Sequence, residues 1–144
     1  MHFFLSIPVI LLLIIHFVNK NLPNSFPLPE VPVPNTWQYI WLTSLIPGLA
    51  GYISLNRSRL SLIQFYYKGT IILGLGTILT TMVMNAPDLL EYAQTKQTNN
   101  LYNGFPILVF WYMYLFVMIQ IHAFGIYFAR ILINAWSLDG RKKK

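Results

Sequence analysis

Four apolar runs separated by polar segments make up most of the hydropathy pattern of the chain. The hydrocarbon core of a bilayer is about 30 Å thick and a helix rises about 1.5 Å per residue, so runs of this length can cross a membrane as helices. The pattern predicts an all-α polytopic membrane protein: a four-helix transmembrane domain, residues 1–136, followed by a cytoplasmic basic tail, residues 137–144. The predicted transmembrane helices cover about residues 2–18, 37–55, 60–84 and 105–128.

The last apolar run ends close to a cluster of basic residues. Phe105–Phe128 contains no charged side chain and would measure about 36 Å as a helix. The chain then closes on Arg141, Lys142, Lys143 and Lys144. Because basic flanks resist translocation, we expect these residues to be cytoplasmic. If extended, residues 137–144 could reach about 26 Å beyond Trp136, far enough for a soluble coat subunit to bind them clear of the headgroups.

The remaining basic residues favour the same orientation. Those on the side of the tail are Arg57, Arg59, Lys68 and Arg130, and those on the other side are Lys20 and Lys96. With the tail included the count is eight against two, which predicts that both termini are cytoplasmic. The only N-glycosylation sequon, which begins at Asn56, then lies in a cytoplasmic turn and should carry no glycan.

Both connectors on the far side are polar. Residues 19–35 are rich in proline and predict an extended loop, whereas residues 85–103 contain a short amphipathic stretch. Asp88 and Glu91 are three residues apart, but no histidine or further acid accompanies them, so we interpret them as a solvated face and predict no metal site.

Aromatic and small residues occur where membrane helices need them. Trp37, Tyr39 and Trp136 are predicted interface anchors. Pro47 and Gly51 lie inside the second span, and we favour a kink with close helix packing over the broken helix of a transport site. Gly69 and Gly76 belong to a small-residue face suited to packing against a helix of this chain, of a second copy or of another membrane protein.

Few polar side chains lie inside the spans. Gln120 and His122 are predicted to hydrogen-bond to neighbouring helices. They are two residues apart, about 200° around a helix, so we expect that they do not serve one site. Lys68 lies near enough to the interface to extend its amine into it. A small transporter or channel subunit, suggested by Pro47, Lys68 and His122, is the alternative function.

Composition supports a membrane protein and excludes several other classes. The chain is 56% hydrophobic and only 10% charged, far from the composition of an ordinary soluble domain. Its net charge of +6 comes from residues at membrane edges and in the tail, so we do not expect it to bind nucleic acid. It contains no cysteine and no known catalytic or phosphate-binding motif, and we predict neither a cofactor nor enzymatic activity. The first two spans are about 26 Å each. This length suits a thin bilayer of about 27 Å, such as that of the endoplasmic reticulum, better than a plasma membrane of about 32 Å.

Positions in the second and fourth spans resemble a known family in register. In the second span they are Trp37, Tyr39, Ser44, Pro47, Gly51, Ser54 and Arg57. In the fourth they are Gln120, His122, Ala123, Tyr127, Arg130, Leu132 and Trp136. The chain resembles the Jagunal family, multi-pass proteins of the endoplasmic reticulum membrane with four spans and cytoplasmic termini. The resemblance implies a non-enzymatic role in endoplasmic reticulum organisation and vesicle-mediated transport, with the COPI coat as partner.

Two features depart from the family pattern. Family members carry a cytoplasmic segment before the first span, whereas this sequence begins at the apolar run, so either the sequence is partial or that segment is dispensable. The family's C-terminus resembles a dilysine retrieval signal with lysine at the third and fourth positions from the end. Here those positions are Lys142 and Arg141, and the planar guanidinium should bind the coat less tightly than an ammonium group.

Overall fold

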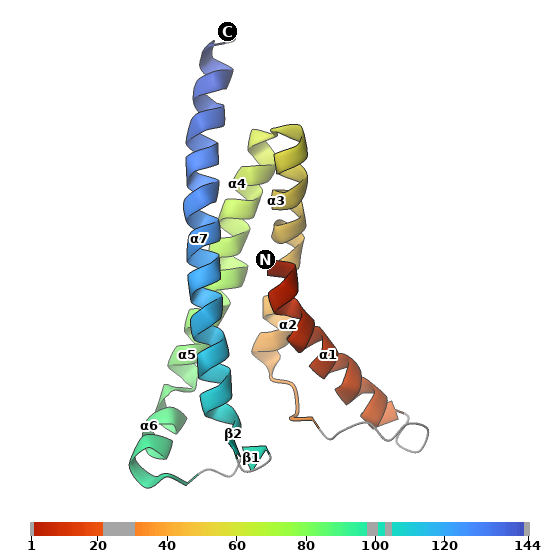
Figure 1. Cartoon of the computed structure of the whole chain (residues 1–144), viewed down its shortest axis with the longest axis vertical. Coiled ribbons are helices and arrows are strands. Elements are labelled where there is room, and N and C mark those ends of the chain that lie inside the picture. Colours follow the sequence, from red (N-terminus) through yellow and green to blue (C-terminus); the bar gives the residue numbers. More distant parts are fainter. Residues whose placement is uncertain (1, 22–30, 98–100, 103–104, 143–144) are drawn as a thin grey trace.

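The structure is mostly helical, as predicted. The computed structural model describes residues 2–21, 31–97, 101–102 and 105–142. In chain order the helices are α1 (His2–Asn21), α2 (Thr36–Leu42), α3 (Leu45–Arg57), α4 (Leu60–Gly69), the π-helix η1 (Thr70–Gly76), α5 (Thr77–Met84), α6 (Ala86–Thr95) and α7 (Ile107–Lys142). A small antiparallel hairpin of β1 (Leu101–Tyr102) and β2 (Phe105–Pro106) precedes α7 (Figure 1).

The third predicted span is one long helical element. α4, η1 and α5 follow one another without a break over Leu60–Met84, and this helical element has the same bounds as the predicted span. The π-helical section in its middle was not predicted. Its hydrogen bonds reach one residue further along the chain than α-helical ones, so side chains beyond it point in directions that a regular helical period does not give.

The second predicted span is divided in two. α2 ends at Leu42 and α3 begins at Leu45, so the break falls one turn before Pro47. Proline has no amide hydrogen to donate to Thr43, four residues back, and the Thr43 carbonyl instead accepts from Ile46 N at 3.1 Å. The Ser44 hydroxyl donates to the Trp41 carbonyl at 2.5 Å, a backbone contact that often bends helices.

Two helices run beyond the predicted spans. α1 continues to Asn21, so the connector does not begin at residue 19. α7 continues to Lys142, so residues 137–142 are helical and not extended. Nothing between Trp136 and Lys142 forces the helix to stop, since no proline occurs there. Six helical residues add only about 9 Å beyond Trp136.

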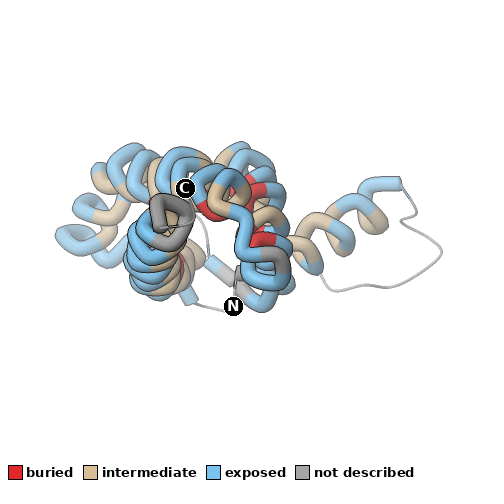
Figure 2. The backbone as a smooth tube through the Cα atoms, turned by 90° about the horizontal axis from the view of Figure 1, so that it is seen from above, coloured by how far each residue is buried: buried red, intermediate tan, exposed pale blue. Residues whose placement is uncertain are grey.

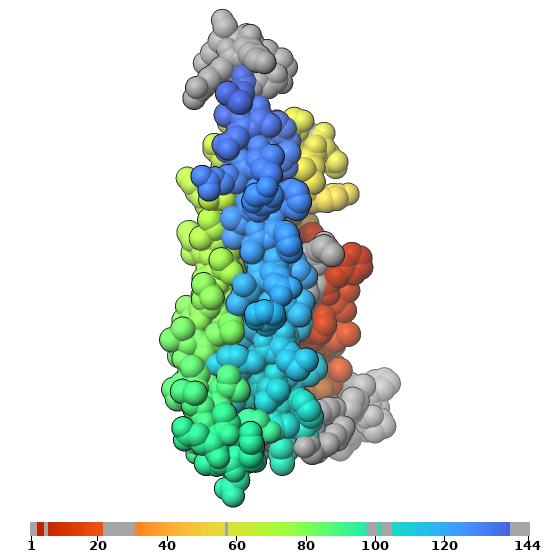
Figure 3. All heavy atoms as spheres, turned by 60° about the vertical axis from the view of Figure 1, so that its left-hand side comes forward, coloured from red at the N-terminus to blue at the C-terminus, as the bar shows by residue number. Residues whose placement is uncertain are grey.

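The long helices lie side by side in an elongated bundle. α3 and α4 form an antiparallel pair joined at Ser58, whose left-handed backbone (φ 45°) ends α3. α7 packs along α4 and η1, and α1 crosses the bundle obliquely with fewer neighbours (Figure 1). In the space-filling view α7 runs down the face between α4–α5 and α1 (Figure 3). The α3–α4 turn lies towards the end where α7 finishes, and α6 lies at the other end; α1 begins partway along α7 (Figure 1).

The core is small and lies where the segments meet. Its buried apolar residues are Val9, Trp41, Ile78, Leu115 and Met118, from α1, α2, α5 and α7. Exposed positions cover the outer faces of the helices (Figure 2), and they include large apolar side chains such as Phe4, Ile72, Phe116 and Phe124.

This distribution favours a lipid environment. Soluble monomers rarely expose contiguous apolar patches larger than a few hundred Å². Leu60–Met84 and Ile107–Leu138 are each long and apolar enough to cross a membrane, and only 22% and 17% of their most apolar windows are buried. The core helix of a soluble protein would be mostly buried, so these two helices fit membrane spans.

Candidate functional site

Small residues bring α3 and α4 into close contact. Gly69 on α4 packs against the Pro47 ring on α3: a Cβ at Gly69 would lie 2.5 Å from the proline Cβ. One turn further along α3, a Cβ at Gly51 would lie 2.7 Å from the Tyr66 ring. Pro47, Gly51 and Gly69 therefore meet at one helix pair, in the packing role that the sequence predicted for them.

His122 lies at the contact between α7 and η1. Its side chain is 2% exposed, and its Nδ1 donates to the Met118 carbonyl of the same helix at 2.7 Å. The ring fills the space left by Gly74, where an added Cβ would collide with it, and lies 6.2 Å from the Trp41 ring. The Nδ1 hydrogen bond is thus within α7, and the imidazole also packs across the helix interface against Gly74 and near Trp41.

Two other predicted packing residues lie elsewhere. The nearest atom to a Cβ at Gly76 would be the Ile71 carbonyl of its own helical element, at 3.3 Å. Gln120 is exposed on α7. It nevertheless borders the same half-open hollow of about 650 Å³ as His122, between α3, α4 and α7.

The groups that suggested a transporter do not line a common path. Pro47 packs on Gly69, and Lys68 is exposed on α4. His122 packs against Gly74 and borders the hollow, whose lining is largely apolar. A pore needs polar groups aligned along one lumen, and these three residues are not aligned in that way.

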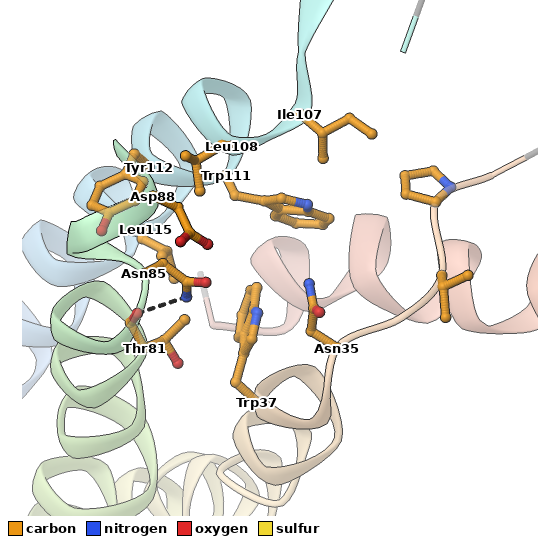
Figure 4. A pocket seen from close by; sticks show the side chains of 12 residues that line it. Asn35, Trp37, Thr81, Asn85, Asp88, Ile107, Leu108, Trp111, Tyr112 and Leu115 are labelled. Carbon is orange, nitrogen blue, oxygen red and sulfur yellow. Dashed lines mark hydrogen bonds between the residues drawn. The ribbon is translucent and has the colours of Figure 1, made fainter. Parts of the chain in front are cut away.

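A second cavity, which we call the polar pocket, lies at the end of the bundle near α6. It measures about 390 Å³, and its lining includes Asn35, Trp37, Asn85, Asp88 and Trp111. Figure 4 shows Asn85 and Asp88 on one side, Asn35 on the opposite side, and the two indole rings between them. Sequence reasoning missed this pocket.

Hydrogen bonds fix the walls of the polar pocket. The Asn85 amide donates to the Thr81 carbonyl at 2.8 Å, at the junction of α5 and α6. The Tyr112 hydroxyl donates to the Met82 carbonyl at 2.6 Å and so ties α7 to α5. The Trp37 and Trp111 rings meet edge to face with centroids 5.5 Å apart, a favourable aromatic geometry.

The predicted interface anchors occupy different environments. Tyr39 is 52% exposed on α2. Trp37 and Trp136 are half-buried, the former against Trp111 near the start of α7 and the latter near its end. Asp88 and Glu91 are both exposed on α6. Across the described ranges, no three histidine or carboxylate side chains gather as metal ligands would.

The C-terminal end of α7, where the basic tail begins, lies at the end of the bundle opposite α6 (Figure 1). Arg141 and Lys142 belong to the last turn of α7. Lys143 and Lys144 fall outside the described residues. Cations at a helix C-terminus interact favourably with the helix dipole. Stabilisation of the end of α7 would therefore explain the basic residues there even if they bind no partner.

The fold and the apolar outer faces fit a helical membrane protein. The sequence model described as "Jagunal, ER re-organisation during oogenesis" matches residues 1–140. The chain therefore belongs to the Jagunal family. This membership and the apolar helices fit a protein of the endoplasmic reticulum membrane.

Individual relatives agree with the family assignment. The chain is 31% identical over 124 residues to the protein jagunal homolog of Caenorhabditis elegans, an alignment covering 84% of this chain and 61% of the relative. It is 29% identical over 122 residues to protein jagunal of Drosophila melanogaster, covering 80% and 62%. It is 27% identical over 120 residues to protein jagunal homolog 1 of Homo sapiens, an alignment covering 80% of this chain and 63% of the relative. The chain thus spans about three-fifths of these relatives.

Proposed function

We propose that this chain is a non-enzymatic, four-span protein of the endoplasmic reticulum membrane that supports reticulum organisation and early-secretory vesicle transport. The observation that carries the proposal is the family match over residues 1–140, whose description names reticulum re-organisation. The exposed apolar faces of α7 and of the α4–η1–α5 element support a membrane location. α1 and the broken α2–α3 segment would supply the other two spans.

Localisation and rescue together test this role. A tagged copy should co-fractionate with reticulum markers, and its expression in Drosophila oocytes that lack protein jagunal should restore the distribution of the reticulum. An inert reticulum-anchored protein of similar length is the control. Residence mainly in the plasma membrane would contradict the proposal, as would correct residence without any rescue.

The tail is proposed to recruit the COPI coat and so return the protein to the reticulum. Free α7 is helical to Lys142, so the coat would bind the tail after its last turn opens. Helix ends fray readily, because the final carbonyls lack intrahelical partners. A coat subunit would then bind the cationic side chains with acidic groups.

Matched variants separate this signal from a simple topology flank. Lys142→Ser and Lys143→Ser each remove one charge from neighbouring positions, but only Lys142 occupies a position of the dilysine pattern. Lys142→Ser should move the protein towards the Golgi and weaken coat pull-down, whereas Lys143→Ser should have a much smaller effect. Arg141→Lys should strengthen the pull-down. Equal effects of the two serine variants would contradict a coat-binding signal and would indicate that the tail only sets the orientation of the protein in the membrane.

A further inference from the structure

An apolar groove adjoins the polar pocket, and the two share a wall. The groove measures about 520 Å³ and lies between α1 and α7. Pro32, Ile107 and Trp111 line both cavities. Beyond this shared wall the groove is lined by Pro8, Leu12 and Phe110, among others. A polar compartment and an apolar one therefore lie next to each other at Trp111.

The polar pocket has the chemistry of a site for a cationic amine. Its walls contain the indole rings of Trp37 and Trp111, and aromatic faces attract quaternary ammonium and alkylammonium groups. Asp88 adds a carboxylate, and the described residues that line the pocket include no lysine or arginine. The Asn35 and Asn85 side chains border the same space and offer amide groups for hydrogen bonds (Figure 4).

The position of the two cavities matches that of a lipid. The polar pocket lies where α5 ends and α7 begins, at the end of the long apolar helices, where headgroups lie in a bilayer. The groove continues along α1 and α7, whose outer positions are apolar. An occupant with a cationic head and a hydrocarbon chain would satisfy both compartments at once.

We propose that the polar pocket and the adjoining groove form a binding site for one phospholipid with an amine-bearing, zwitterionic headgroup. Its ammonium group lies between Asp88 and the Trp37–Trp111 pair. One acyl chain follows the groove past Leu12. The shared chemistry is that of choline and ethanolamine headgroups, and a free choline cation offers the same head without the chain.

Native mass spectrometry of the full chain in defined lipid mixtures tests the head pocket. The protein should retain phosphatidylcholine or phosphatidylethanolamine in preference to phosphatidylglycerol with identical acyl chains. Asp88→Asn keeps the side-chain shape and removes the charge, and should reduce that preference about threefold to fivefold. Glu91→Gln is the matched control, because Glu91 is an exposed carboxylate of the same helix that does not line the pocket.

A second pair of variants tests the groove independently. Leu12→Trp places a large ring in the groove and should lower the amount of retained phospholipid several-fold. Leu11→Trp is the control, since Leu11 is 52% exposed and lies outside the groove lining. Free choline and phosphocholine should compete only weakly, because neither fills the groove.

Three results would overturn the assignment. If phosphatidylglycerol were retained as well as phosphatidylcholine and phosphatidylethanolamine, the ammonium group would not be what the pocket recognises. Identical behaviour of Asp88→Asn and Glu91→Gln would place the head elsewhere. Full displacement of the lipid by free choline would show that the pocket takes a soluble cation and that the groove contributes nothing.

Discussion

At the scale of single residues, the contacts of this bundle depend on which glycines face a neighbouring helix. Gly69 and Gly74 meet Pro47 and His122, whereas Gly76 meets only its own helical element. A regular helical period predicted Gly69 and Gly76 as members of one face. The π-helical section η1 alters the angular order of residues 70–76, so Gly74 faces α7 in place of Gly76.

A matched pair of alanine variants tests this assignment. Gly74→Ala places a methyl group against the His122 ring and should lower the free energy of unfolding by about 1–3 kcal/mol, as overpacking does. The methyl group added by Gly76→Ala would contact only one carbonyl oxygen, at 3.3 Å. This variant should change the free energy of unfolding by less than about 1 kcal/mol, because alanine also favours helix. Thermal unfolding in detergent compares the two, and similar melting temperatures would contradict the contact at Gly74.

At the scale of elements, hydropathy predicted where helices occur better than where they end. Apolar runs gave the bounds of Leu60–Met84 correctly because polar residues flank that run on both sides. The polar residues after Trp136 predicted a tail, but serine, aspartate and even glycine can continue a helix whose preceding turns are stable. Helix breaks are also local hydrogen-bond events, and the one at residues 43–44 combines Pro47 with hydroxyls that bond to the backbone.

Replacing the proline tests the cause of this break. Pro47→Ala restores an amide that can donate to the Thr43 carbonyl, so α2 and α3 should join into one helix. The new hydrogen bond contributes about 1 kcal/mol and opposes the loss of the proline contact with Gly69, so net stability should change little. Amide exchange by NMR is the measurement: the alanine amide should be protected. Rapid exchange there would assign the break to the Thr43 and Ser44 hydroxyls.

At the scale of the whole molecule, the polar pocket could not be predicted from the sequence. Its lining comes from three separate parts of the chain, around Asn35, around Asn85 and Asp88, and around Trp111. Asp88 was interpreted as part of a solvated face, which its exposure agrees with, yet its position beside two indole rings depends on how α2, α6 and α7 pack. The helix-pair contacts of Pro47, Gly51 and Gly69 were predictable because small residues in apolar helices have few other roles.

The charge pattern and the fold together predict which end of the bundle faces the lumen and can be glycosylated. The natural sequon begins at Asn56, in the last turn of α3, and Lys96 lies after α6 at the opposite end of the bundle. Eight basic residues against two predict that the Asn56 end is cytoplasmic and the Lys96 end lumenal. A glycosylation acceptor at position 96 should therefore meet the lumenal transferase, whereas Asn56 should not.

Lys96→Asn creates such an acceptor, because the third residue of the new sequon is Thr98. The substitution suits the backbone, since Lys96 has a φ of 56° and asparagine tolerates the left-handed region better than lysine does. In cells the variant should gain a glycan that endoglycosidase H removes, whereas Lys96→Gln, which loses the same charge without forming a sequon, should migrate as the parent chain. A glycan at Asn56, with none on Lys96→Asn, would invert the orientation and place the basic tail in the lumen, where no cytosolic coat could bind it.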